Sequence, residues 1–570
     1  MAWISIPRVS RSAGRLRFVA AAAALFAVGC QSLEVTNTND PDTRRALATG
    51  GDIKALVGGA YFQWYSSMQR SAPAMTVSTM ADAYTSSWGN DGMRAYSAEP
   101  RVALFNSPTE RADILQAFQG PWYGNYSAVV SANLAIKAID GGVNIDITDA
   151  SQTPMVRAAA RFLQGAGLSN ISLYYDQGFI VDETTDVAAL TFSTHQEIRD
   201  AALVKLDATI ALAGATTFQL PDVYLNHSGW TNIQLAQVAN TIAARTIAYS
   251  ARTDAENTAA DWARVVSYAS KGISSGARFD PSITGDAGVA WEDGYKAYGN
   301  YYSTWARVDM RIVCLLDPAQ PCRHPNNATQ IGRPVSLDYR FNGGVVGGND
   351  TQYSDFVWDP VIPHNPARGY YHFSEVGHQR WLGYSWESAT PLEGVVPFML
   401  AAENDLLWAE GLVRTNTNLA LAATLINNSR VGRGHLTPAT AADGATALIN
   451  RIFYERSIEL LGVSGCVDWY DARRTTGFNA TTFTGRGLQV GTARHFPVPA
   501  KELLVLQQEI YTFGGPSLPD MSVTAGGSAS SRGIFGESGG REIVGPGQVG
   551  QIADDLFAAS SRAHRSRQRM

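Results

Sequence analysis

Apolar residues recur at intervals of three and four positions along most of the chain, which predicts a mainly α-helical fold. Alanine and glycine recur within these segments, at places where neighbouring helices must approach closely. Antiparallel pairs of such helices predict a tetratricopeptide-like stack, although no strict repeat of about 34 residues is visible. The predicted helices lie at about 125–139, 156–175, 193–207, 229–250, 258–274, 396–413, 417–430 and 444–462.

Two of these segments carry further local signals. Thr194 and Glu197 have the spacing of a capping box, which predicts the start of a helix. In the segment 125–139 a single apolar face is expected to pack against a neighbouring helix. The residues of that predicted face are Tyr126, Val129, Val130, Leu134 and Ala138.

The amino-acid composition changes twice along the chain. Between about 275 and 395, glycine, proline, asparagine and aromatic residues dominate, which predicts long loops with short strands. The aromatic content argues against disorder in this insertion. After Pro516 the chain becomes rich in glycine and serine, which predicts a flexible tail at 517–570. The helical domain with its insertion is therefore expected to span 30–516.

The first 29 residues have the composition of a secretion signal. They contain four arginines and no acidic residue, followed by a mostly alanine run that is too short to span a bilayer. The run ends in L-F-A-V-G-C, which resembles the lipobox of bacterial lipoproteins and makes Cys30 the candidate lipidated residue. Two or more acyl chains would anchor the protein stably. A plain signal peptide cleaved near Ala24 is the alternative.

Charge excludes one class of partner. The chain has a formal net charge of -6 at pH 7, and removing a signal with four arginines gives about -10 (-6 - 4). Nucleic-acid binding requires basic patches, so we expect no nucleic-acid partner. No other segment is apolar enough to cross a membrane.

The cysteines other than Cys30 have separate interpretations. Cys314 and Cys322 bracket a proline-containing loop and could form a disulfide in an oxidising compartment, with two free thiols as the alternative. Their spacing does not match a zinc site. Cys466 is then unpaired, and we expect a buried, inert thiol.

The stretch Y-E-R-S-I-E-L-L-G-V-S-G-C-V-D-W-Y-D-A-R-R, at 454–474, concentrates charges, a thiol and an indole. Such a concentration is compatible with an active site or with a structural scaffold. Glu455, Arg456 and Glu459 lie on the polar side of a predicted helix, where charged side chains join helix ends and loops. We therefore predict a scaffold.

Several motifs, in their order and spacing, resemble the SusD/RagB family over about 30–516. They are W-Y-G-N-Y-S-A-V-V-S-A-N-L, A-A-E-N-D-L-L-W-A-E-G-L-V with A-A-T-L-I-N-N-S-R-V-G-R-G, E-R-S-I-E-L with W-Y-D, and R-H-F-P-V-P-A-K-E-L. One departure is that 463–468 lacks the Glu and Arg of the family's E-G-x-R, which marks a divergent member. The main matching positions are Trp122, Tyr126, Asn133, Glu403, Leu406, Ala409, Glu410, Ile426, Asn427, Arg430, Arg433, Gly434, Pro497, Pro499 and Glu502.

The resemblance implies a SusD-like fold and a nutrient-binding lipoprotein on the cell surface. Such proteins pair with a SusC-like TonB-dependent outer-membrane transporter and deliver an oligosaccharide, or in some cases a peptide, without covalent catalysis. No cofactor or metal is expected. Gln31 after the cysteine favours sorting to the outer membrane, by resemblance to known lipoproteins.

Two segments have the composition of a sugar-binding surface. Aromatic rings cover the C–H face of a sugar, while amides and guanidinium groups meet its hydroxyl rim. The first segment, 82–96, and the second, 291–307, both mix aromatic and polar residues. Aromatic residues in loops over a helical stack can equally be core. The candidate ligand residues are Tyr84, Trp88, Asn90, Arg94, Tyr298 and Trp305.

An enzyme is the less favoured interpretation. The sequence has no G-x-S-x-G, H-E-x-x-H or P-loop motif. The acidic pairs Glu292–Asp293 and Asp405–Glu410 could serve glycoside hydrolysis, but such pairs are common in acidic proteins. We therefore predict no catalytic residues.

Two further interpretations of the sequence need separate tests. His372 and His378 lack a clear third ligand, so we predict no metal site. A helical-repeat scaffold that binds only protein partners is the alternative function. Buried positions for Trp88 and Trp305 would favour that scaffold.

Overall fold

The structure is a computed structural model that describes residues 47, 49–286, 291–300, 305–341, 354–385 and 388–516. The predicted signal peptide, Cys30 and the predicted tail at 517–570 lie outside the described residues, so these predictions stay predictions. Among the helices in the described ranges, none combines the length and the hydropathy needed to cross a bilayer.

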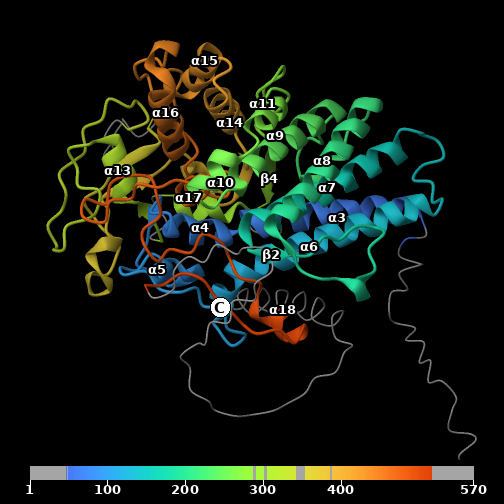
Figure 1. The fold of residues 1–570 in the computed structure, drawn as a ribbon, viewed down its shortest axis with the longest axis horizontal. Helices are drawn as coiled ribbons and strands as arrows, with labels where there is room; N and C mark the ends of the chain where they lie inside the picture. The colour runs from blue at the N-terminus through green and yellow to red at the C-terminus, as the bar shows by residue number, and fades with distance from the viewer. Residues whose placement is uncertain are drawn as a thin grey trace, which may run out of the picture. The chain divides into compact units, whose positions relative to one another are not determined.

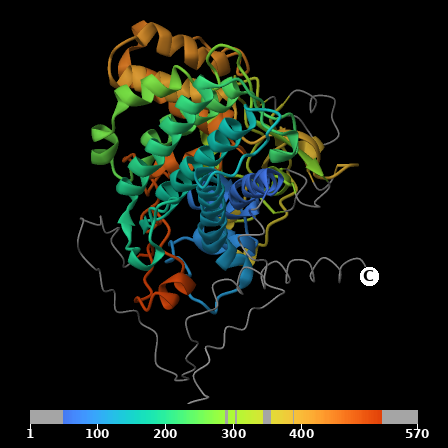
Figure 2. The ribbon, with the colours of Figure 1, turned by 90° about the vertical axis from the view of Figure 1, so that its right-hand side faces the viewer.

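The longest elements of the described chain are helices that pack in a stack (Figure 1). Successive helices from α6 to α9 pack on one another, and α14 packs on α9, α11, α15 and α16. The view turned by 90° again places α14–α16 beside α9 and α11 (Figure 2). The mainly α-helical prediction is confirmed. The long helices are α3 (Gly50–Gln69), α4 (Ser71–Met80), α6 (Ala112–Asp140), α7 (Gln152–Tyr174), α8 (His195–Ala215), α9 (Asn232–Ser250), α11 (Trp262–Ala269), α14 (Ala401–Arg414), α15 (Leu419–Arg430) and α16 (Gly444–Glu459).

Short helices connect and flank the stack. Some of them also contain residues of the candidate site. They include α5 (Met93–Tyr96), α10 (Asp254–Ala259), α12 (Gly294–Gly299), α13 (Met310–Leu316), α17 (Val467–Arg473) and α18 (Ala500–Val505), with the 3₁₀ turns η5 (Pro366–Arg368) and η6 (Tyr370–His372).

Local signals explain several helix starts, and two predictions need correction. The predicted capping box is present, since Glu197 N donates to Thr194 Oγ1 at 3.3 Å and Thr194 N donates to the Glu197 carboxylate at 2.8 Å. The single helix predicted at 258–274 is instead α10 and α11, because Asp261 caps a new helix by accepting from the backbone N–H of Arg264. On α6, Val130 is 48% exposed rather than on the packed face.

Strands are short and mostly belong to the predicted loop-rich insertion. Each is paired antiparallel with one partner, and two of the pairs join distant parts of the chain. In the described ranges the pairs are β1 (Tyr84–Thr85) with β5 (Arg307–Val308), β2 (Gln177–Gly178) with β3 (Ser193–Thr194), β4 (Ser282–Asp286) with β8 (Glu393–Pro397), and β6 (Phe356–Trp358) with β7 (Val376–His378).

Two predictions about the cysteines are confirmed, the disulfide and the buried free thiol. Cys314 and Cys322 form a disulfide with an S–S distance of 1.99 Å, which closes the proline-containing loop after α13. Cys466 is a free thiol in the core. Burial raises the pKa of the Cys466 thiol to about 12, so the nucleophilic thiolate is scarce at neutral pH.

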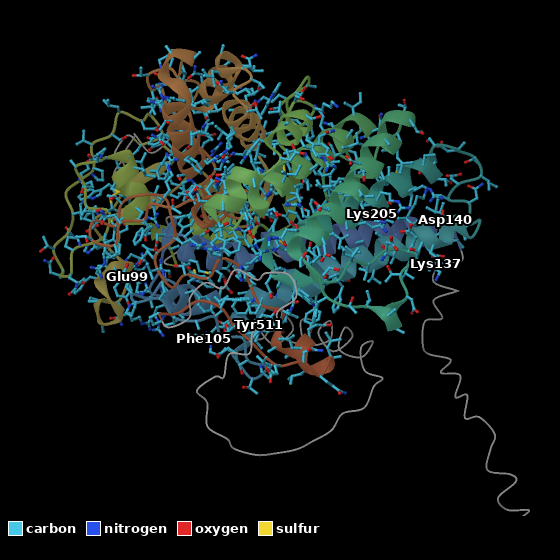
Figure 3. All side chains as sticks on the ribbon, viewed as in Figure 1. Glu99, Phe105, Lys137, Asp140, Lys205 and Tyr511 are labelled. Carbon is cyan, nitrogen blue, oxygen red and sulfur yellow. A yellow bond between two sulfur atoms is a disulfide. The ribbon has the colours of Figure 1, made fainter. Side chains whose placement is uncertain are left out.

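The last described residues form a strap across the loop that follows α5. Asn106 Nδ2 donates to Tyr511 O at 2.9 Å, and Leu104 N donates to Phe513 O at 2.9 Å. Phe105 and Tyr511 accordingly lie close together in the stick view (Figure 3). The segment that leads into the predicted tail is therefore hydrogen-bonded to the N-terminal part of the domain.

Candidate functional site

The charged stretch at 454–474 is a buried ion-pair network. Glu410 of α14 accepts from Arg456 at 2.6 Å and from Arg474 at 2.8 Å, and these three side chains are fully buried. Asp471 also accepts from Arg474, at 2.6 Å. Although burial alone would raise it, the pKa of Glu410 is held well below its usual range by Arg474, Arg456 and Arg414. This network joins α14, α16 and α17 and has the character of a scaffold.

A second network fastens the loop-rich insertion to α16. Arg340 donates to Asp338 at 2.7 Å, to Glu455 at 2.8 Å and to Glu459 at 3.1 Å. Arg433 donates to Glu459 from the other side at 3.0 Å. Each charged side chain of these two networks is paired with another, while Asp468 in the same stretch is half-buried, accepts a hydrogen bond from the Ser457 hydroxyl at 2.5 Å and has a pKa that burial raises to about 6.

Of the other carboxylates that could serve a hydrolase, Asp293 and Asp405 are occupied, whereas Glu292 is half-buried and burial raises the pKa of its carboxyl. Asp293 bonds the ammonium of Lys296 at 2.5 Å, with both side chains fully buried. Asp405 accepts from Arg278 at 2.5 Å and from Asn428 at 2.8 Å. Paired carboxylates that face the interior are poorly placed for acid and base catalysis on a sugar.

The structure brings the two predicted ligand segments together. The β1–β5 pair aligns Tyr84 with Val308 and Thr85 with Arg307, so the first segment runs beside the second. The Ser86 hydroxyl then links their continuations, because it donates to Trp305 O and accepts from Trp88 N at 3.1 Å. Two segments more than 200 residues apart in sequence thus form one region of surface.

The aromatic side chains of this region differ in how far they are exposed to solvent. Trp88 is 39% exposed, and Arg94 on α5 is also exposed. Asn90 is half-buried. Tyr298 and Trp305 are half-buried and stack on each other, with ring centroids 4.0 Å apart and an interplanar angle of 24°. The region therefore combines an indole that is exposed to solvent with a pair of half-buried rings that stack on each other.

Tyr84 is a correction to the predicted ligand residues. Its side chain is fully buried, and its hydroxyl is hydrogen-bonded to His378 Nδ1 at 3.0 Å. The ring also meets Tyr295 edge to face. Tyr84 belongs to the core beneath the site and cannot reach a ligand.

A third segment, absent from the predicted site, completes the region. Arg368 of η5 donates from Nη1 to Ser87 O at 2.7 Å, and Asn365 N donates to Ser87 Oγ at 3.1 Å. Both Asn365 and Arg368 are exposed. No local sequence signal marks this contact, since it depends on how the insertion folds back. We call the resulting surface the aromatic platform, and it consists of Trp88, Asn90, Arg94, Tyr298, Trp305, Asn365 and Arg368.

The histidines near the platform are structural. His364 Nδ1 contacts His372 O at 2.5 Å, and both rings are buried. Burial lowers the pKa of His364 to about 4 and that of His378 to about 3, so both are neutral at physiological pH. In the described parts of the chain, no three histidine, cysteine or acidic side chains gather as metal ligands would.

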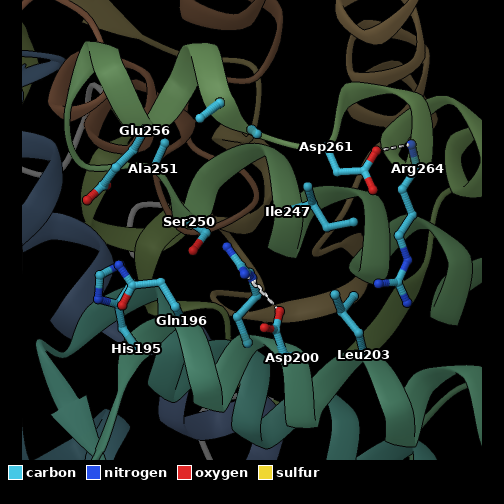
Figure 4. A pocket seen from close by; sticks show the side chains of 13 residues that line it. His195, Gln196, Asp200, Leu203, Ile247, Ser250, Ala251, Glu256, Asp261 and Arg264 are labelled. Carbon is cyan, nitrogen blue, oxygen red and sulfur yellow. Dashed lines mark hydrogen bonds and ion pairs between the residues drawn. The ribbon is translucent and has the colours of Figure 1, made fainter. Parts of the chain in front are cut away.

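A cavity of about 320 Å³ lies between α8, α9, α10 and α11 (Figure 4). Several of its polar groups pair with one another or with backbone, as Asp200 does with Arg199 at 2.8 Å and Asp261 with Arg264 N at 2.9 Å, whereas the buried His195 Nε2 has no hydrogen-bond partner among the described residues. The cavity walls also contain His195, Leu203 and Ile247, among others. It has no exposed aromatic ring.

A larger cavity of about 420 Å³ lies between α13, α16 and the loop at 483–486. Phe453 and Phe483 form much of its wall, beside the Cys314–Cys322 disulfide. Its guanidinium groups are occupied, because Arg311 bonds Asp82 at 2.9 Å and Arg486 bonds Asn450 at 2.7 Å. The aromatic platform is therefore the better candidate site for a sugar.

Comparison with solved structures extends over most of the chain. A SusD superfamily protein from Parabacteroides distasonis has a TM-score of 0.56 at 13% identity, over 80% of this chain and 97% of that one. A SusD superfamily protein from Bacteroides vulgatus has a TM-score of 0.54 at 14% identity, over 83% and 99%. Surface glycan-binding protein A from Bacteroides uniformis has a TM-score of 0.50 at 14% identity, over 80% and 98%. No protein-family model and no curated protein sequence matches the chain.

Proposed function

We propose, from the SusD-like fold that this chain has, that it is a cell-surface lipoprotein that captures nutrient oligosaccharide. In this proposal Cys30 carries the lipid anchor in the outer membrane, and the bound sugar passes to a SusC-like TonB-dependent transporter. Solved structures with this fold include proteins described as carbohydrate-binding or glycan-binding. A peptide ligand and a scaffold that binds only protein are the alternatives.

The aromatic platform supplies the chemistry that such binding needs. The indole of Trp88 and the stacked rings of Tyr298 and Trp305 present apolar faces for the C–H side of sugar rings. Asn90 and Asn365 offer amide donors and acceptors to the hydroxyl groups. Since Tyr298 and Trp305 already stack on each other, little side-chain conformational entropy is lost at this pair on binding.

The exposure of Trp88 carries the proposal. A scaffold that binds only protein has no need of an indole that is 39% exposed beside a stacked aromatic pair. Of the carboxylates that would favour a hydrolase, Asp293, Asp405 and Glu410 are paired with cations, so Glu292 has no free carboxylate beside it at Asp293. Binding without turnover therefore explains the platform better than the other two functions do.

Replacing Trp88 by alanine is expected to weaken oligosaccharide binding about tenfold or more, because truncating a central aromatic contact typically costs at least 1 to 2 kcal/mol. Isothermal titration or affinity electrophoresis measures the change. Phe105→Ala is the matched control, since Phe105 is 36% exposed and lies outside the platform. Equal affinities of the Trp88→Ala variant and the unmodified protein would remove the platform from the proposal.

The transporter role needs a separate test. The tagged protein would be extracted in mild detergent after cross-linking, and co-purified chains identified by mass spectrometry. A TonB-dependent barrel at matching abundance is the expected result. Recovery of the lipoprotein alone would contradict the partner, while sugar binding measured as above would still stand.

A further inference from the structure

Two arginines contact the loop that carries the exposed indole of the aromatic platform. Arg94 donates its backbone N–H to Trp88 O at 3.0 Å, which places the first turn of α5 against the indole-bearing loop. Arg368 reaches the same loop from the insertion, since its Nη1 donates to Ser87 O at 2.7 Å. Both arginines are exposed. Two exposed arginines therefore border the loop that carries Trp88.

These two arginines differ from their charged neighbours. Arg111 is paired with Asp113 at 2.7 Å, Arg323 with Glu99 at 2.6 Å and Arg307 with Asp359 at 3.4 Å. Within the described ranges, no carboxylate lies within ion-pair distance of Arg94 or Arg368. Their charges are not neutralised by the fold, whereas those of the surrounding arginines are.

The acidic residue closest in sequence to Trp88 faces the interior. Asp91, next to Asn90, is only 6% exposed, and its backbone carbonyl accepts from the Thr76 hydroxyl at 2.7 Å. The two cations also act on the same buried ring. Burial lowers the pKa of His372 to about 3, and nearby cations, Arg94 and Arg368 among them, act in the same direction. The solvent-facing side of the platform is therefore positive, on a chain whose net charge is negative.

We infer that the platform binds oligosaccharides that carry anionic groups, carboxylate or sulfate, with Arg94 and Arg368 as the groups that select for charge. This inference rests on the proposed function. A guanidinium group donates two parallel hydrogen bonds to a carboxylate or sulfate, and such charge-assisted bonds are stronger than those to a neutral hydroxyl. A guanidinium group also donates to the neutral hydroxyls of a sugar, but an anionic group gains more from two arginines that have no carboxylate partner among the described residues.

The test uses the full protein and matched pairs of polymers in affinity electrophoresis. Polygalacturonate is compared with methyl-esterified pectin, and dextran sulfate with dextran, so that each pair differs in charge and shares its backbone. We expect retention by at least one anionic polymer. Arg94→Gln and Arg368→Gln are each expected to weaken it about tenfold, and 0.5 M salt, at which the Debye length is about 4 Å, should weaken it in the unmodified protein.

Arg157→Gln is the control, because it changes net charge by the same unit. Arg157 pairs with Asp140 at 2.6 Å at the distant end of α6 and α7. Equal thermal unfolding midpoints would show that the variants fold. Retention that is lost in Arg94→Gln or Arg368→Gln and kept in Arg157→Gln supports the inference.

The other outcomes separate this inference from the proposal beneath it. Retention by neutral polymers with equal or greater affinity overturns the selection for charge and leaves the sugar-binding function intact. Equal loss in all three variants also overturns it, because the effect would then follow net charge alone. Retention by none of the polymers contradicts both the inference and the proposed carbohydrate binding. Binding of one anionic polymer of the two identifies carboxylate or sulfate as the preferred group.

Discussion

Glu410→Ala is expected to destabilise the domain by at least 3 to 5 kcal/mol, which is a large part of the typical 5 to 15 kcal/mol that holds a protein folded. The substitution removes a carboxylate that accepts from Arg456 and Arg474, both fully buried. Two guanidinium groups would then share the single carboxylate of Asp471 in the interior. An uncompensated buried charge costs far more than the pair itself contributes.

The measurement is the midpoint of urea unfolding followed by tryptophan fluorescence. Asp140→Ala is the control, because Asp140 also pairs with one arginine but is 49% exposed, and exposed pairs contribute about 1 kcal/mol or less. Midpoints of Glu410→Ala and Asp140→Ala that lie close together would show that the network at 454–474 is not the structural centre of the stack. Retained sugar affinity in any folded Glu410→Ala protein would show that the network acts on stability alone.

The network shows which features of the fold can be predicted from the sequence. The E-R-x-x-E-L pattern predicts a helix with a polar side, and α16 is that helix. The partner of Arg456, however, is Glu410, which lies 46 positions earlier and which the sequence alone offers as half of a hydrolase pair. Periodicity identifies which face of a helix is polar but not which distant charge it meets, since that depends on how α14 and α16 pack.

The candidate site shows the same limit. Composition selects 82–96 and 291–307 separately, and Trp88, Arg94 and Trp305 do lie in one region. Nothing in either segment predicts the β1–β5 pair that joins them, because strands of two residues leave almost no periodicity. Arg368 is not predicted either, because its contact with Ser87 depends on how the insertion folds back. Tyr84 is selected for its residue type, although the strand's own burial pattern places it in the core.

The break between α10 and α11 could have been found. Asp261 directly precedes Trp262, and an aspartate before an apolar residue is a standard helix-start signal. The continuous apolar periodicity of 258–274 conceals it. The SusD-like fold, in contrast, is accessible because several weak motifs occur in a fixed order over most of the chain, and the solved structures bear it out.

Acidification is expected to narrow the stability difference between the unmodified protein and the variant His378→Gln. His378 is buried against Tyr84, and burial, with Arg380 and other cations, lowers its pKa to about 3. In the unfolded chain a histidine has a pKa of about 6.5. Between these two values the unfolded state binds a proton that the folded state does not.

The sign follows from that proton. Above pH 6.5 neither state is protonated at His378, so the cost of His378→Gln is constant and reflects packing and the lost contact with Tyr84. As pH falls from 6.5 towards 3, the unmodified protein loses about 1.4 kcal/mol per pH unit through this group, and the variant does not. From pH 6.5 to 4.5 the difference should therefore shrink by somewhat less than about 2.7 kcal/mol, because the group is half titrated at the upper end.

Taking the difference in unfolding free energy between the two proteins at each pH cancels the contributions of the other titrating groups. Several buried carboxyls have raised pKa values, such as Asp176 at about 7, and they act in the opposite direction in both proteins equally. Unfolding in urea at pH 7.5, 6.5, 5.5 and 4.5 gives the four differences. Tyr84→Phe is the control, because it removes the same hydrogen bond without removing the imidazole. A gap that stays constant for His378→Gln would mean that His378 is protonated as readily in the folded state as in the unfolded one. Equal narrowing for Tyr84→Phe, which keeps the imidazole, would show that the narrowing does not come from the titration of His378.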